Sequence, residues 1–225
     1  MIGTFINVTT VLIGSSLGLL IGERIPERIR KTLISGLGLA TLLIGIQMTM
    51  KTGSVLIPIA SIVLGGLAGE LLQIETFLEH LAERLRSYSR SGSSTFVAGF
   101  ITASLVFCVG SMTIVGSIQE GINGDSTLLV TKSLMDGVAS VAFASTLGIG
   151  VAFSALTVLI VQGSLTLLGQ KLAFLLSGSL LNEMTAAGGL MILGIGFLLL
   201  DIKKLKIANY LPALVIAPIL AWLFL

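Results

Sequence analysis

The chain has little of what most enzymes and soluble domains use. Of its 225 residues only 11% are charged, one is a cysteine and one is a histidine. The single cysteine, Cys108, cannot form an intramolecular disulfide, and the single histidine, His80, leaves little scope for metal binding or histidine-based catalysis. No zinc motif, P-loop or dinucleotide-binding motif occurs. The sequence therefore predicts no enzymatic activity, no metal, no cofactor and no nucleic-acid partner.

Apolar residues are abundant, at 54% of the chain, and the mean hydropathy is +1.06. A soluble domain has about 25% charged residues, whereas apolar runs near 20 residues match helices that cross a hydrocarbon core of about 30 Å. The sequence predicts an all-α integral membrane protein, a single transmembrane domain over residues 1–225 with the bilayer as its partner. The eight expected spans are residues 2–22, 32–50, 54–73, 95–118, 127–147, 151–170, 184–201 and 208–225.

The distribution of Lys and Arg supports eight crossings. Of the twelve positive residues outside the apolar runs, ten then fall on one side: Arg24, Arg28, Arg30, Lys31, Arg84, Arg86, Arg90, Lys203, Lys204 and Lys206. Only Lys51 and Lys171 fall on the other side. Positive residues accumulate on the cytoplasmic side, so both termini are expected to be extracytoplasmic. This count requires a turn at residues 147–150, where no charge interrupts the apolar run.

A weak internal repeat organises the spans. TVLI at 10–13 recurs at 157–160, LLIGIQM at 42–48 resembles MILGIGF at 191–197, and Pro58 matches Pro212. The matching spans have opposite directions, which predicts inverted three-helix repeats over 1–73 and 151–225, an arrangement common in secondary transporters. Residues 95–150 would form a central helix pair. Residues 74–94 would be an amphipathic surface helix and linker, because apolar and charged positions alternate there at helical spacing.

Lys132 and Asp136 lie in an otherwise apolar span. Each costs roughly 2.5–3.5 kcal/mol to place near the bilayer centre on insertion scales, so such residues normally face a partner, a cavity or a ligand path. Four residues apart, they meet on one helical face, which Ser140 extends. The pair is read either as part of a solute or ion site or as a structural salt bridge.

The preceding span is rich in glycine and hydroxyl residues. Gly110 and Gly116 have two interpretations. They either allow close packing against other helices or permit a break in the helix, whose free backbone groups can bind ions. Ser111 and Met112 reach a depth similar to that of Asp136. The expected substrate or ion site comprises Ser111, Met112, Lys132, Asp136 and Ser140, and the expected hinge or backbone-lining positions are Gly110, Gly116, Gly148 and Gly150. In the first span, Asn7 precedes a ridge of Gly14, Gly18 and Gly22, which predicts close helix packing.

VGSMTIVGSIQEGINGD at 109–125 and KSLMDGVASVAFASTLGIGVAFSA at 132–155 resemble the YqgA/YdfK-like family of small bacterial inner-membrane proteins of unknown function. The resemblance extends over essentially the whole chain, including INVTTVLIGSSLG at 6–18. It implies a bacterial multi-span inner-membrane protein that is suspected of transport, without an established substrate.

The residues and the resemblance together favour a secondary transporter or permease. It would move a small polar solute or ion through a midplane site between the fourth and fifth spans. The alternatives are a passive ion channel, which would need a homo-oligomer or a continuous polar pore, and a structural or signalling membrane protein. No ATP-binding motif occurs, which disfavours primary pumping.

Overall fold

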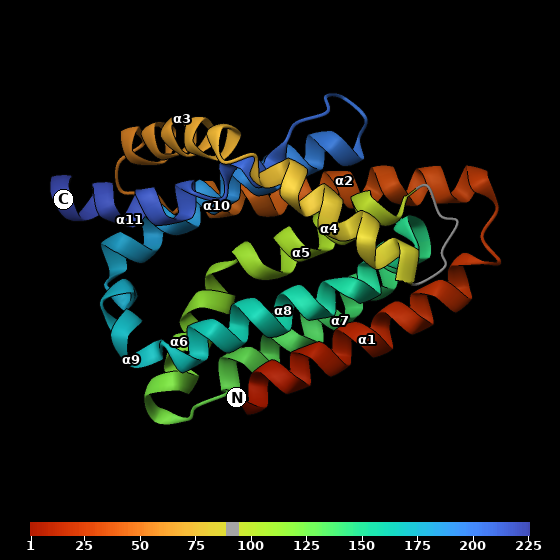
Figure 1. Ribbon diagram of the computed structural model, residues 1–225, viewed down its shortest axis with the longest axis horizontal. Coiled ribbons are helices and arrows are strands. Elements are labelled where there is room, and N and C mark those ends of the chain that lie inside the picture. Colours follow the sequence, from red (N-terminus) through yellow and green to blue (C-terminus); the bar gives the residue numbers. More distant parts are fainter. Residues whose placement is uncertain (89–94) are drawn as a thin grey trace. The chain divides into compact units, whose positions relative to one another are not determined.

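The structure is a computed structural model that describes residues 1–88 and 95–225 (Figure 1). These residues form helices and no strand, which confirms the predicted all-α class. They divide into two compact units, each built from two separated pieces of chain. Unit 1 comprises residues 1–34 and 79–173, and unit 2 comprises residues 35–78 and 174–225. The linker expected at 91–94 lies outside the described residues.

Unit 1 contains five long helices and a short one: α1 (Ile2–Gly22), α5 (Phe96–Val109), α6 (Ser111–Asn123), α7 (Thr127–Leu147), α8 (Gly150–Leu167) and α9 (Gly169–Leu172). Helix α1 lies along α7 over its whole length (Figure 1). A Cβ atom at Gly14 would lie 2.2 Å from the carbonyl oxygen of Gly137, and one at Gly18 would lie 2.4 Å from that of Val141. Only glycine allows this approach, so the predicted packing role of the ridge is confirmed.

The span expected at 95–118 is broken. Helices α5 and α6 meet at Gly110 with a bend of 59°. The Thr113 hydroxyl donates to the carbonyl oxygen of Phe107 at 2.8 Å and so satisfies one of the groups that the break frees. Gly110 is one of the two glycines expected to permit a break in this span, and the two halves together are apolar enough for either a broken span or a re-entrant loop.

Helix α7 has defined ends. The Asp125 carboxylate accepts the N–H of Thr127 at 3.0 Å, and this bond together with one from the Thr127 side chain lowers the pKa of Asp125. At the other end Gly148 has φ of +83°, a conformation that favours glycine, and α8 begins at Gly150. The predicted turn between the fifth and sixth spans is therefore confirmed.

Unit 2 contains α3 (Leu56–Leu71), α10 (Gly178–Leu199), the 3₁₀ helix η2 (Ile207–Tyr210) and α11 (Ala213–Phe224). The division between units falls within α2 (Glu27–Thr49), α4 (Ile74–Tyr88) and the 3₁₀ helix η1 (Ala173–Leu176). Small residues allow close contacts here too, because Gly65 abuts Ala213, and Ala187, Ala213 and Ala217 form an apolar cluster. Helix α10 begins six residues before the expected span at 184, since Ser177 ends the preceding turn in an extended conformation.

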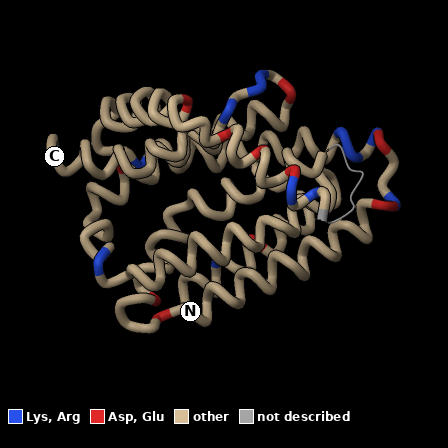
Figure 2. The backbone as a smooth tube through the Cα atoms, in the orientation of Figure 1, with Lys and Arg blue, Asp and Glu red and all other residues tan. Residues whose placement is uncertain are grey.

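Six described helices are long and apolar enough to cross a membrane, or eight segments if each bent pair counts as one span. The bent pairs are α3 with α4 and α5 with α6. Figure 2 shows charged residues gathered at helix ends and connecting segments, with long uncharged stretches between them. The expected total of eight crossings is compatible with this range.

The predicted repeat matches three pairs of helices, and the two helices of each pair pack against each other in opposite directions. Each of these contacts lies within a single unit. Along α2 and α10, Gly38 meets Leu200 while Gly45 meets Leu193. Helices α3 and α11 are also antiparallel, and in unit 1 the start of α1 lies beside Gly163 near the end of α8. A two-fold axis in the membrane plane would produce such pairs. The repeat itself stays a prediction.

Candidate functional site

Lys132 and Asp136 are both buried in unit 1 and form an ion pair on one face of α7. Asn7 of α1 donates from Nδ2 to Oδ2 of Asp136 at 2.9 Å. Lys132 Nζ also contacts Oδ2, and no hydrogen bond to Oδ1 is found among the described residues. The Lys132 ammonium lies 5.9 Å from the centroid of the Phe107 ring, within cation–π range. The site thus combines a buried ion pair with one carboxylate oxygen that a ligand could engage.

The glycine ridge explains how Asn7 reaches Asp136. Helices α1 and α7 run in the same direction, since Gly3 meets Leu129 and Gly18 meets Val141. Close backbone contact along the ridge brings the short Asn7 side chain within hydrogen-bond distance. Packing was the favoured role of the first span, and the contact between Asn7 and Asp136 was not predicted. The available signal was Asn7 itself, the one amide side chain in this uncharged span.

Ser140 lies one turn beyond Asp136, but its hydroxyl is used within α7. It donates to the Asp136 carbonyl oxygen at 2.7 Å, and its Cβ faces Gly14. Ser111 and Met112 are the first residues of α6 and are half-buried. Among the described residues, no hydrogen bond or ion pair joins either of them to Lys132 or Asp136. The structure therefore brings together Lys132 and Asp136, adds Asn7 and Phe107, and leaves Ser111 and Met112 at the adjacent break.

The four expected hinge glycines occupy different environments. Gly110 stands at the break with φ of −68° and ψ of 145°, and a Cβ there would meet nothing within 4 Å. Gly116 lies inside α6 against Leu129, and Gly150 packs on the Phe96 carbonyl oxygen. Gly148 has the positive φ of the α7–α8 turn. Of the four, only Gly110 interrupts a span.

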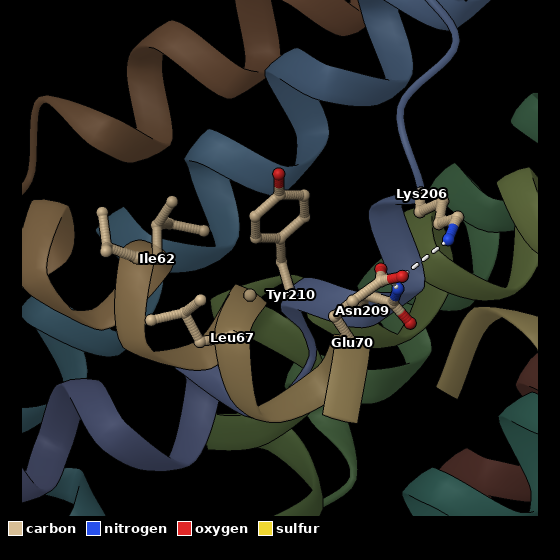
Figure 3. A pocket seen from close by; sticks show the side chains of 8 residues that line it. Ile62, Leu67, Glu70, Lys206, Asn209 and Tyr210 are labelled. Carbon is tan, nitrogen blue, oxygen red and sulfur yellow. Dashed lines mark hydrogen bonds and ion pairs between the residues drawn. The ribbon is translucent and has the colours of Figure 1, made fainter. Parts of the chain in front are cut away.

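A cavity of about 310 Å³ lies in unit 2, and none of the expected site residues lines it. Figure 3 shows Tyr210, Ile62 and Leu67 around its apolar part. At its polar edge Glu70 accepts from Lys206 Nζ at 2.8 Å and from Asn209 Nδ2 at 2.6 Å. These polar groups satisfy one another and join α3 to η2, so we assign this cluster to packing of unit 2.

The sequence was compared with known families, proteins and structures. The profile of the family described as "Protein of unknown function (DUF554)" matches residues 2–222. The chain is similar to "Uncharacterized membrane protein YdfK" of Bacillus subtilis (strain 168), with 33% identity over 97% of this chain and 95% of that protein. It is also similar to "Uncharacterized protein YqgA" of Escherichia coli (strain K12), with 34% identity over 96% of this chain and 94% of that protein. No solved structure matches.

Proposed function

We propose, on the premise that the chain belongs to the DUF554 family of membrane proteins of unknown function, that it is a secondary transporter of the bacterial inner membrane. It would move a small polar solute or ion past Lys132 and Asp136. The observation that carries the proposal is the buried Lys132–Asp136 pair, in which one oxygen of Asp136 accepts no hydrogen bond from the described residues. No enzymatic step and no cofactor belong to it.

Burial of the pair favours a functional role. Two buried charges must be paired to remain ionised, and replacing such a pair by apolar residues is often neutral for stability. A membrane span that needs only to pack has no requirement for them. A cationic ligand at Oδ1 could compete with Lys132 for Asp136, while Asn7 keeps the carboxylate oriented. Lys132 would then move toward Phe107, whose ring can hold an ammonium group.

The break at Gly110 provides a moving part beside this pair. Phe107, whose ring centroid is 5.9 Å from the Lys132 ammonium, lies in the last turn of α5 before the break. A change of the bend at Gly110 would therefore displace Phe107 relative to α7. Discontinuous helices near a midplane site are a recurring feature of secondary transporters, because their free backbone groups bind ions and their halves move separately.

Purified protein in liposomes on a solid-supported membrane tests the proposal. Small amines, amino acids and monovalent ions are applied in turn, and wild type should give a current with at least one class. Lys132→Met together with Asp136→Leu should fold and give no current. The matched control replaces the exposed pair of unit 2 by Lys206→Met with Glu70→Leu and should keep the current.

A folded Lys132→Met, Asp136→Leu protein with wild-type currents would show that the pair is a structural bridge. A current that persists at steady state and does not depend on a coupled ion would instead indicate a passive channel.

A further inference from the structure

Unit 1 contains a second group of buried polar side chains that the Lys132–Asp136 pair does not use. All lie on α1, α6 and α8, which contact one another. Each has at least one polar atom that finds no hydrogen-bond partner among the described residues. These atoms are Thr4 Oγ1, Ser117 Oγ, Glu120 Oε2, Gln162 Oε1 and Nε2, and Thr166 Oγ1.

Glu120 is the one charged residue of this group. Its Oε1 accepts the N–H of Gly3 at 2.8 Å, next to Thr4, and lies 3.4 Å from the amino group of Met1. Ser117 precedes Glu120 by three residues and shares its face of α6. A Cβ at Gly121 would lie 2.2 Å from the carbonyl oxygen of Thr166, which places the end of α6 directly against α8.

Gln162 belongs to the same region. It lies one turn before Thr166 on the buried face of α8, and its neighbour Gly163 contacts the Met1 side chain. Gln162 is completely buried, and neither its oxygen nor its nitrogen has a partner among the described residues. A buried amide without partners is costly, so a bound ligand that satisfied it would remove this cost.

Unit 2 shows how this protein satisfies a buried glutamate when its role is structural. Glu183 accepts the Thr52 hydroxyl at 2.6 Å on Oε2, and on Oε1 it accepts the N–H groups of Gly53 at 2.6 Å and Ser54 at 3.2 Å. Both oxygens are therefore occupied. Glu120 likewise accepts a backbone N–H near the start of a helix, but its second oxygen has no partner in the described chain.

We propose that Glu120 Oε2, with the oxygens of Thr4, Ser117, Gln162 and Thr166, binds a small monovalent cation such as Na⁺. Carboxylate, hydroxyl and amide oxygens are ligands for hard cations. A single carboxylate matches one positive charge, whereas Ca²⁺ sites usually combine several carboxylates. The Met1 side chain is 33% exposed, so this end of the chain is open to water that can share the charge of the amino group, and Glu120 Oε2 remains for the ion.

The location suggests that this ion is the coupling ion, a role that rests on the proposed transport function. Thr4 and Asn7 are three residues apart and share a face of α1. Asn7 donates to Asp136, and its own Oδ1 is buried without a partner among the described residues. Thr4 and Asn7 therefore place the proposed cation site and the ion pair along one face of α1.

The binding step is tested without any transport measurement. The melting temperature of the purified full chain is measured in NaCl, KCl and choline chloride at equal ionic strength and pH. Wild type should melt higher in NaCl or KCl than in choline chloride, because a ligand that binds only the folded state stabilises it. Glu120→Gln should weaken the apparent affinity by about tenfold or more. Glu79→Gln, which removes an exposed carboxylate of α4, should keep the full shift.

Gln162→Leu covers the case in which Glu120→Gln fails to fold. In choline chloride this variant should be at least as stable as wild type, because it removes an unpartnered buried amide. It should lose most of the cation-dependent shift. Equal melting of wild type in all three salts, or an undiminished shift in Gln162→Leu, would overturn the proposal. The Lys132→Met, Asp136→Leu variant should retain the shift, so failure of the cation site and failure of the transport site remain distinguishable.

Discussion

Asp136→Leu should be among the most destabilising substitutions in unit 1. It leaves the buried Lys132 ammonium without its counter-charge, which costs about 3–5 kcal/mol when one partner of a buried pair is removed. It also leaves Asn7 Nδ2 without an acceptor, for about 1–3 kcal/mol more. Lys132→Met should cost less than Asp136→Leu, because Asp136 keeps the Asn7 donor.

The double substitution should be more stable than either single one. With Lys132→Met and Asp136→Leu together, no unpaired charge remains, and only the Asn7 amide is left unsatisfied at about 1–3 kcal/mol. Adding Asn7→Leu should recover part of that loss. Two side chains in direct contact are expected to be strongly non-additive in this way.

Reversible unfolding in mixed detergent micelles, followed by circular dichroism, gives the free energies of unfolding of wild type, of the two single variants and of the double variant. The costs of the two single substitutions should not simply add in the double variant. Additivity would mean that Lys132 and Asp136 do not neutralise each other in the folded protein.

Three further outcomes follow from the packing and the charges. Glu183→Gln should lower the free energy of unfolding by about 1–3 kcal/mol, because the new amide cannot accept hydrogen bonds from all three donors that the carboxylate binds. The exposed Glu27→Gln should leave it unchanged in the same unfolding assay, and equal effects would contradict a structural role for Glu183. Gly18→Ala should lower the free energy of unfolding by about 1–3 kcal/mol, because the new Cβ would collide with the α7 backbone. Gly110→Ala meets open space, so it should keep stability and lower flux if the break moves, and unchanged flux would show that Gly110 is not a hinge. A reporter fused at Lys204 should read cytoplasmic, and a periplasmic signal would eliminate the eight-span topology.

Hydropathy and glycine patterns were sufficient to predict the helical spans and some of their contacts from the sequence. Apolar length gave the spans, and the Gly14–Gly18–Gly22 ridge predicted close packing, because lipid offers no other reason for a row of small residues. The turn at Gly148 followed from charge counting. Gly110 was one of two positions at which the sequence allowed a break, because Gly110 and Gly116 both precede a serine and nothing in the sequence decides between them.

The site was predicted only as far as local spacing reaches. Lys132 and Asp136 lie one turn apart, so helical geometry alone pairs them. Their other partners, Asn7 and Phe107, come from different helices, and no pattern within one helix specifies which neighbour it meets. Ser140 shared the face of Asp136 but satisfied its hydroxyl on the backbone of its own helix, as serine often does.

The two units differ in how their buried polar groups are satisfied. Every described side-chain atom that is buried without a hydrogen-bond partner belongs to unit 1, including those of Asn7, Glu120 and Gln162. In unit 2, both carboxylate oxygens of the buried Glu183 accept hydrogen bonds from a neighbouring segment. Unpartnered polar groups lower stability, and a fold that can satisfy them in one unit has no structural need to leave them open in the other. We therefore expect substitutions at buried polar positions of unit 1 to alter ligand response, and those of unit 2 to alter stability alone.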